Sequence, residues 1–103
     1  MNNGMTGKFI IARCCDAGVH AGFLEATEGR ECILVDAHRL WCWQVPKGAS
    51  DFLSGVASAG LDWDGSKVGC AVRIHLTDVC ELIECSPEAA ISIQKAPICM
   101  RTK

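Results

Sequence analysis

The strongest fold signal in the chain is the stretch GVHAGFLEATEGRECILVD, residues 18–36. Residues 19–27 are rich in β-forming side chains, and Gly22 among them indicates a bend or bulge, because glycine weakens a regular strand and permits close backbone approach. A turn centred on Gly29 follows. In residues 31–37 two sets of side chains then alternate along the chain, as they do on the two faces of a strand. The stretch therefore predicts a curved β-hairpin.

The flanking segments extend this β pattern. Residues 8–14 (KFIIARC) predict a strand that reaches the hairpin through turn chemistry at 16–18. Residues 38–45 (HRLWCWQV) continue the pattern after the hairpin. Later in the chain, residues 68–85 are β-rich again. Their single candidate junction is at 77–78, so they form either two strands or one long bent strand.

Two short helices complete the pattern. The first is expected over residues 51–59, with Ser50 as its N-cap. The second is expected to run to about Lys95, because it opens with serine, proline and glutamate, a sequence typical of a helix start. Before it, the pair Asp64-Gly65 predicts a hairpin turn.

These elements predict an α+β fold, namely a small, strongly curved antiparallel β-sheet or a barrel of the SH3 or Sm type, with one or two short helices. A chain of 103 residues suits a single domain. We expect this domain to span residues 8–103. A polar N-terminus rich in glycine and asparagine, residues 1–7, is expected to be flexible.

Composition and charge exclude several classes of partner. The net charge is −2 at pH 7, so the chain lacks the positive field that binding to duplex nucleic acid requires. The apolar runs are far shorter than the roughly 20 residues that cross a bilayer, so no membrane partner is expected. Half of the residues are hydrophobic and the mean hydropathy is +0.20, which indicates a homo-oligomer whose interface covers apolar surface.

The eight cysteines are expected to be reduced and to pack as small hydrophobes. This expectation follows from an N-terminus without the apolar core of a secretory signal, which predicts a cytosolic protein. No C-x2-C spacing occurs, and neither Cys14-Cys15 nor Cys80-x4-Cys85 matches the usual zinc spacings, so no metal is predicted. The alternative is a redox role for the vicinal pair beside Arg13.

The stretch RLWCWQVPKGAS, residues 39–50, holds the candidate binding site. If the strand continues through it, Arg39, Trp41 and Trp43 share one face. A guanidinium and an indole on one face can stack on a base or another aromatic ring. The first part of this stretch therefore predicts an aromatic plate with a positive charge beside it.

The second part of the stretch predicts an anion site. Lys47, Gly48 and Ser50 lie just before the expected helix, whose free N–H groups and dipole favour a negative charge. The stretch lacks the G-x4-G-K-[ST] spacing of a phosphate-binding P-loop. Arg73, on a later strand, either adds charge to the same pocket or lies on an exposed face. Together these residues predict a clamp for a small anionic ligand.

The alternative interpretation of these residues is structural. Both tryptophans then belong to the core, Arg39 pairs with a carboxylate such as Asp36, and Ser50 only caps its helix. Pairs such as Asp36 with His38 lie beside no nucleophile in an elbow-like context. We therefore expect no catalytic residues, no cofactor and no enzyme activity.

Two blocks of the chain, DAGVHAGFLEATEGRECILVDAHRLWCWQVPKGAS and LTDVCELIEC, resemble a family of small phage and prophage proteins. The resemblance is carried by an A-G-x-x-A-G-x-L hairpin, an R-L-W-x-W strand and an L-T-D-x-C-E-L-I-x-C strand, and it covers residues 9–98. It departs at residues 44–47, where the family has a shorter link. The resemblance implies a phage-encoded protein that acts in the host cytoplasm, and it brings no known activity with it.

Two functions fit these observations. The first is a non-enzymatic, oligomeric binding protein that sequesters a small anionic ligand, such as a nucleotide signal of host defence. The second is a protein–protein interaction module, in which the tryptophan-rich face binds a host or phage protein.

Overall fold

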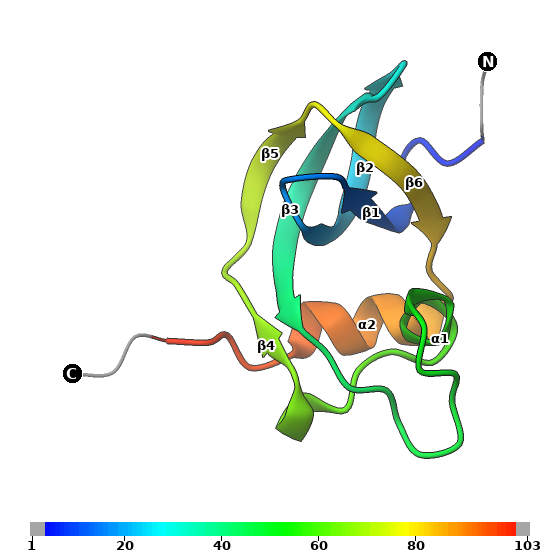
Figure 1. Ribbon diagram of the computed structural model, residues 1–103, viewed down its shortest axis with the longest axis vertical. Coiled ribbons are helices and arrows are strands. Elements are labelled where there is room, and N and C mark those ends of the chain that lie inside the picture. The colour runs from blue at the N-terminus through cyan, green and yellow to red at the C-terminus, as the bar shows by residue number, and fades with distance from the viewer. Residues whose placement is uncertain (1–3, 101–103) are drawn as a thin grey trace.

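The computed structural model describes residues 4–100, in which a strongly curved antiparallel β-sheet lies above two short helices (Figure 1). This is the predicted α+β class, with the sheet curled toward a barrel but not closed. Residues 1–3, part of the N-terminus that was expected to be flexible, and residues 101–103 lie outside the described part of the chain.

The first half of the chain forms three consecutive antiparallel strands, β1 (Phe9–Cys14), β2 (Val19–Glu28) and β3 (Glu31–Cys42). Gly18 and Gly29 occupy the two connecting turns with φ of 83° and 58°, values that favour glycine and agree with the predicted turns. β3 includes both the second strand of the predicted hairpin and the strand-like segment that follows it.

Gly22 bends β2, as its position in the sequence indicates. The pairing register between β2 and β3 shifts between Ala21 and Phe23. A Cβ atom on Gly22 would come 2.8 Å from the Cα of Ala37 on β3, so only glycine lets the two strands approach this closely. The prediction of a bent hairpin is confirmed.

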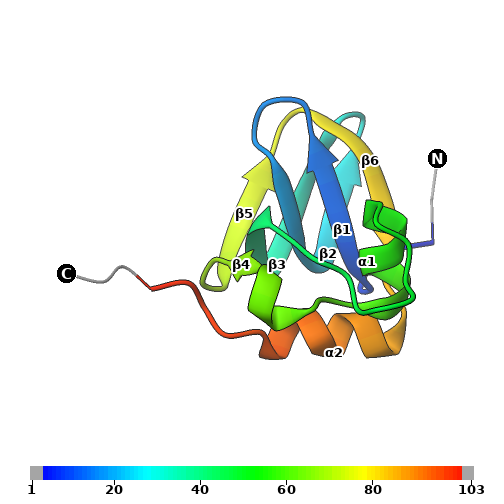
Figure 2. The ribbon, with the colours of Figure 1, turned by 60° about the horizontal axis from the view of Figure 1, so that its bottom comes forward.

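The β-rich region late in the chain contains separate strands. β4 (Lys67–Val68) and β5 (Val72–Leu76) both pair with β3, whereas β6 (Val79–Glu84) pairs with β1. Residues 77–78 join β5 to β6, so the chain crosses there from one edge of the three-stranded unit to the other (Figure 2). The alternative of one long bent strand is therefore wrong.

The first helix, α1 (Leu53–Ala59), begins two residues later than the sequence predicts. Its N-cap position is Phe52, and no side chain caps it. The hydroxyl oxygen of Ser50 accepts only a long contact of 3.4 Å from the N–H of Phe52. The Ser50 backbone lies directly against Gly55, where a Cβ atom would overlap it, so this segment crosses the first turn of α1 instead of extending it. The prediction that Ser50 caps the helix is wrong.

The second helix, α2 (Pro87–Lys95), begins as predicted. Its cap is Ser86, whose hydroxyl oxygen accepts the N–H of Ala89 at 3.0 Å. The predicted hairpin turn before it is instead a 3-10 turn, η1 (Trp63–Gly65), because the carboxylate of Asp62 accepts an N–H within it. Across residues 4–100, neither helix is long and apolar enough to span a membrane.

The strands β1, β2 and β3 send side chains into two apolar clusters. Alternate residues enter different clusters, because successive side chains of a strand point to opposite faces. The cluster between the sheet and the helices, here called the helix-side core, comprises Phe9, Ile11, Val19, Ala21, Leu40, Val56, Ala57, Leu61, Val68, Ile93 and Ala96. The cluster inside the curl of the sheet, the inner core, comprises Ile10, Ala12, Cys14, Leu24, Cys32, Leu34, Ala37 and Leu76.

Candidate ligand-binding groove

Arg39 and Trp41 lie together in a hollow of about 290 Å³ at the end of β3. This hollow, which we call the β3–β4 groove, is lined by Arg39, Trp41, Lys67, Val68, Gly69 and Cys99. Two of these residues are cations, one is an indole, and none is acidic. A cationic and aromatic lining of this kind suits a flat, negatively charged molecule.

Backbone pairing on both sides of β4 builds the groove. On one side, the N–H of Gly69 donates to the carbonyl of Arg39 at 2.9 Å. On the other side, the N–H of Cys99 donates to the carbonyl of Val68 at 2.8 Å, and Ile98 forms a parallel bridge with Val68. Three segments that are distant in the sequence are therefore held side by side by main-chain hydrogen bonds.

Trp41 is exposed at a bulge of β3. The register between β3 and β4 shifts between Leu40 and Cys42, which leaves Trp41 as the extra residue. Leu40 is 3% exposed in the helix-side core, whereas Trp41 is 77% exposed. An indole left in water carries unburied apolar area, and a ligand or partner that covers it gains that burial.

The two cations of the groove have no ion-pair partner within residues 4–100, because neither Arg39 nor Lys67 belongs to a salt bridge there. The field of Arg39 reaches His20, its cross-strand partner on β2. Burial lowers the pKa of His20, and the positive charge of Arg39 lowers it further. An anion in the groove would therefore meet local positive charge in a protein whose net charge is −2.

Trp43 does not share the face of Arg39 and Trp41, so the prediction of one common face is wrong. β3 ends at Cys42, and beyond the bulge Trp43 turns toward the helix-side core and packs against it. Trp43 also lines a separate hollow of about 510 Å³ beside α1, next to Arg13. The structural interpretation thus fits Trp43 in part, whereas it fails for Trp41.

Lys47, Gly48 and Ser50 do not form the predicted anion site at a helix terminus. Lys47 and Gly48 occupy an exposed turn that is closed by a hydrogen bond of 3.0 Å from the N–H of Ala49 to the carbonyl of Pro46, with φ of 91° at Gly48. α1 begins only at Leu53 and has seven residues. Lys47 and Gly48 therefore do not directly precede the helix, as the prediction required.

Arg73 is neutralised by a partner. Its guanidinium donates to both carboxylate oxygens of Glu25 on β2, at 3.2 and 2.6 Å. This contact lowers the pKa of Glu25 and raises that of Arg73. Arg39, by contrast, does not pair with Asp36, which occupies a bulge of β3 with φ of 51°. Of the two arginines, only Arg39 has its charge free for a ligand.

Sequence reasoning missed Lys67, Gly69 and Cys99, which complete the groove. β4 has only two residues, too few to give a strand pattern. The parallel bridge to Ile98 is a single pairing between segments with no shared sequence signal. The one feature of the sequence that could have pointed to Lys67 is its position directly after a predicted turn and before a β-rich region.

Two histidines, one on β3 and one on β5, are held by hydrogen bonds, and only His38 lies near the groove. His38 is 6% exposed, and its Nδ1 lies 2.8 Å from the carbonyl oxygen of Gly69, so this nitrogen carries the proton and fixes that wall of the groove. His75 instead contacts the carboxylate of Glu31 at 2.8 Å on the exposed surface. In the described chain, no group of three or more His, Cys, Asp or Glu side chains is placed to hold a metal ion.

The eight cysteines form no disulfide in the structure, and their packing differs from the prediction. Cys14 and Cys32 are buried in the inner core, and Cys85 is half-buried. Five are exposed on the surface, where they cannot act as small hydrophobes of a core: Cys15, Cys42, Cys70, Cys80 and Cys99. The sequence pattern of a strand does not reveal which of its faces is covered.

Comparison with known proteins places the chain in a family without supplying a function. Neither the search of curated proteins nor the search of solved structures found a match. One family model matches residues 7–93, which include every strand and nearly all of α2. The chain belongs to the family described as Domain of unknown function (DUF6948).

Proposed function

We propose that this protein is a non-enzymatic binding protein that holds a small anionic, nucleotide-like ligand in the β3–β4 groove. The observation that carries the proposal is the placement of an exposed indole, Trp41, beside the unpaired guanidinium of Arg39. An indole stacks on a base, and a guanidinium pairs with phosphate oxygens in two parallel hydrogen bonds. Lys67, on β4, adds a second positive charge to the lining.

The proposed setting is the host cytoplasm during phage infection, where the protein would sequester a nucleotide signal of host defence. Sequestration needs no chemistry, because a binding protein in excess lowers the free concentration of its ligand by mass action. The resemblance to small phage and prophage proteins supports this setting. The positive lining of the groove supports the anionic nature of the ligand.

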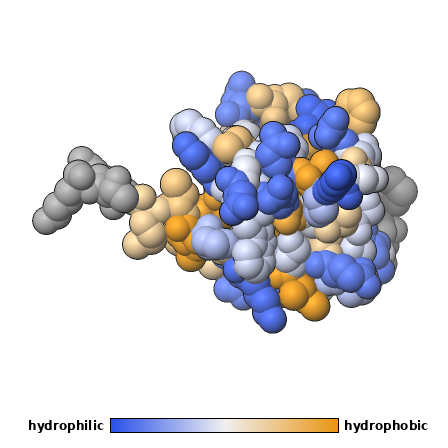
Figure 3. All heavy atoms as spheres, turned by 90° about the horizontal axis from the view of Figure 1, so that it is seen from below, coloured by the Kyte–Doolittle hydropathy of each residue, from blue (hydrophilic) through white to orange (hydrophobic). Residues whose placement is uncertain are grey.

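We further propose that the protein self-associates. Large apolar side chains are exposed beside the groove: Trp41 at 77%, Ile98 at 41% and Met100 at 74%. Figure 3 shows hydrophobic side chains gathered where the C-terminal segment leaves the globule. A second copy of the chain that covers these residues would bury apolar area and deepen the groove.

The same exposed residues favour one alternative function, a protein–protein interaction module. In that case Trp41, Ile98 and Met100 are contact residues for a host or phage protein, and the cations of the groove are only its polar rim. The two functions differ in what they require of Arg39 and Lys67. Ligand binding depends on both charges, whereas an apolar interface depends mainly on the indole and the C-terminal side chains.

The decisive experiment is thermal unfolding of the purified protein against a panel of mono-, di- and cyclic nucleotides. A ligand at 100 times its Kd stabilises the native state by about 2.7 kcal/mol. For a domain of this size such a stabilisation raises Tm by roughly 10 °C or more. We expect at least one nucleotide to give a shift of this order, and a panel without any shift would contradict the proposal.

Two double variants separate binding through the groove from general charge effects. Arg39→Ala with Lys67→Ala removes both groove cations and is expected to abolish the nucleotide-induced shift. Lys47→Ala with Lys95→Ala removes the same charge from exposed positions outside the groove and is expected to keep the shift. Equal loss of the shift in both double variants would show that binding depends on overall charge, not on the groove.

A further inference from the structure

Two exposed thiols that are far apart in the sequence meet at one end of the sheet. The Sγ atoms of Cys15, in the turn after β1, and Cys80, in β6, lie 3.0 Å apart although 65 positions separate them. Cys14, the sequence neighbour of Cys15, points into the inner core, where burial raises its pKa to about 11. The close pair is therefore Cys15 with Cys80, and not the vicinal pair that the sequence suggests.

The backbone around both thiols is fixed by hydrogen bonds. The N–H of Cys15 donates to the carbonyl of Asp78 at 3.1 Å, and the N–H of Asp16 donates to the Asp78 carboxylate at 2.8 Å. The register between β1 and β6 shifts just after Arg13, which brings the start of the turn over the start of β6. Strand pairing thus brings the backbone of Cys15 next to that of Cys80.

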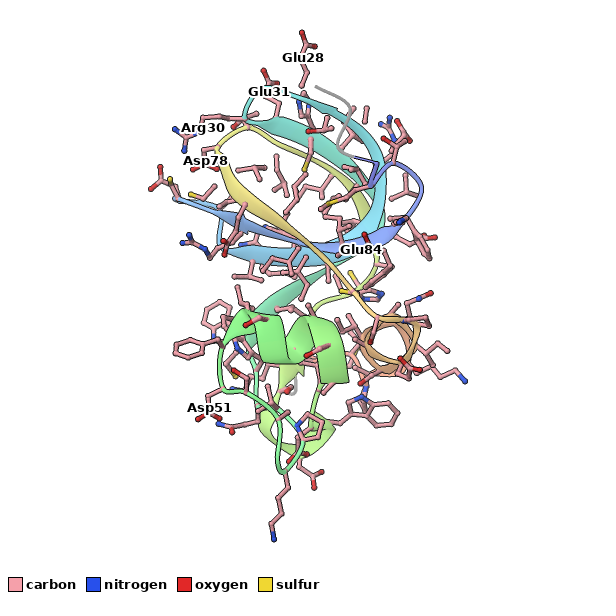
Figure 4. All side chains as sticks on the ribbon, turned by 90° about the vertical axis from the view of Figure 1, so that its right-hand side faces the viewer. Glu28, Arg30, Glu31, Asp51, Asp78 and Glu84 are labelled. Atoms are coloured by element: carbon pink, nitrogen blue, oxygen red, sulfur yellow. The ribbon has the colours of Figure 1, made fainter. Side chains whose placement is uncertain are left out.

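A guanidinium lies on the outer side of the pair. Nη2 of Arg30, in the turn between β2 and β3, donates to Sγ of Cys15 at 3.3 Å. A hydrogen bond also fixes the backbone of Arg30, because its carbonyl accepts the N–H of Val79 at 2.9 Å. Figure 4 shows Arg30 and Asp78 side by side at this end of the curled sheet. A guanidinium in contact with a sulfur atom stabilises a negative charge on it.

The contact between the two thiols raises the pKa of Cys80. The hydrogen bond to Cys15 raises the pKa of Arg30. Because the guanidinium of Arg30 contacts the sulfur of Cys15, the geometry favours Cys15 as the attacking sulfur. Arg13, the other arginine nearby, has its guanidinium engaged by the Glu81 carboxylate at 2.8 Å.

There is space for a small molecule beside the pair. Cys80 lines a hollow of about 580 Å³ together with Thr27 and Glu28 at the end of β2 and Gly29 in the turn that follows. This hollow is distinct from the β3–β4 groove, with which it shares no lining residue. A reagent that carries a disulfide can therefore reach the thiols without entering the proposed nucleotide site.

We propose that Cys15 and Cys80 are a reversible dithiol–disulfide site that low-molecular-weight disulfides, such as oxidised glutathione, oxidise. The Cys15 thiolate attacks one sulfur of the reagent, whose S–S bond breaks and releases one thiolate, leaving a mixed disulfide on Cys15. Cys80 then loses its proton and its sulfur attacks Cys15, releasing the second thiolate. The protein loses two electrons, the reagent gains them, and the two thiol protons end on the two released thiols.

The test is to incubate the reduced protein with oxidised glutathione, block the remaining thiols and measure intact and peptide masses. We expect a loss of two hydrogen atoms, a peptide that links Cys15 to Cys80, and reversal by dithiothreitol. In Cys80→Ser the second step is impossible, so one glutathione should stay on Cys15. Cys70→Ser removes an exposed thiol elsewhere and should behave as the wild type.

Arginine variants test the role of the guanidinium. Arg30→Gln is expected to slow oxidation by roughly tenfold, since it removes the cation in contact with the attacking sulfur. Arg13→Gln is expected to slow it much less, because that cation is engaged by Glu81. Adducts spread over several thiols without the Cys15–Cys80 peptide, or equal rates in the two arginine variants and the wild type, would overturn the proposal.

Discussion

Gly22 of β2 lies so close to Ala37 of β3 that a Cβ atom on Gly22 would come 2.8 Å from the Ala37 Cα and 3.0 Å from its Cβ. The neighbouring atoms belong to backbone and to a rigid methyl group, so they cannot move aside. This contact sets the bend at which the sheet curls away from a flat arrangement. The curl in turn creates the inner core on one face and leaves the other face for the helices.

Replacing Gly22 by alanine should therefore destabilise the fold. Overpacking of a close contact costs about 1–3 kcal/mol, and here the strained atoms lie on two paired strands. Chemical denaturation should show this loss as a lower midpoint with an unchanged slope. Gly69→Ala is the matched control, because its Cβ would meet Arg39 only at ordinary contact distances of 3.6 Å or more. A Gly22→Ala variant as stable as Gly69→Ala would contradict the close packing.

The Ser86 hydroxyl connects the two helices. It accepts the N–H of Ala89 and donates to the carbonyl of Ser58, at 3.0 and 2.8 Å. Ser86→Ala should lower the free energy of unfolding by about 1–2 kcal/mol, because the variant loses both a helix cap and a second hydrogen bond. Ser50→Ala should change stability by less than about 0.5 kcal/mol, because Ser50 caps no helix. Denaturation of both variants checks this contrast, and equal losses would restore the sequence-based assignment of Ser50 as a cap.

Acid should weaken the fold through His20. The side chain is 1% exposed, and burial together with Arg39 lowers its pKa in the native state below the ordinary value of 6.5. The unfolded chain therefore binds a proton first as the pH falls below 6.5, and the free energy of unfolding decreases until the pH passes the native pKa. His20→Gln should flatten the dependence of stability on pH between 7 and 5.5. If the free energy of unfolding of this variant falls with pH as steeply as that of the wild type, His20 does not cause the loss of stability in acid.

Filling the groove should block ligand binding without harming the fold. Gly69 lines the groove and has no left-handed φ, and a Cβ atom there meets Arg39 only at ordinary contact distances, so a larger side chain is expected to extend into the groove. Gly69→Leu should abolish the nucleotide-induced rise in Tm and keep the Tm of the unliganded protein within a few degrees of the wild type. Gly69→Ala, which adds a single methyl group, should retain most of the shift. Retention of the full shift in Gly69→Leu would place the ligand elsewhere.

The curved hairpin could be predicted from the sequence because its information is local. Gly22 interrupts a β-rich segment, and Gly29 marks the following turn, so bend and turn are both visible in residues 18–36. The start of α2 was equally local, since the cap, the proline and the acid are neighbours in the chain. Signals of this kind do not depend on what packs against them.

Only part of the groove lining could be predicted from the sequence. Arg39 and Trp41 are two residues apart on one strand, so strand alternation brings them together. The bulge at Trp41 then reverses the alternation for Trp43, and no residue of the sequence marks it. Lys67 and Cys99 reach the groove through a two-residue strand and a single bridge, both of which depend on the completed fold. The same holds for Cys15 and Cys80, which the pairing of β1 with β6 brings into contact.

The most direct test of the central claim is a titration of the ¹⁵N-labelled protein, followed by NMR, with the nucleotide that gives the largest rise in Tm. The three tryptophans give three indole N–H signals. Binding in the β3–β4 groove predicts that the Trp41 indole and the Gly69 amide shift in a saturable way, while the Trp63 indole stays in place. Signals that shift instead around Lys47 and Gly48, with Trp41 unmoved, would contradict the account.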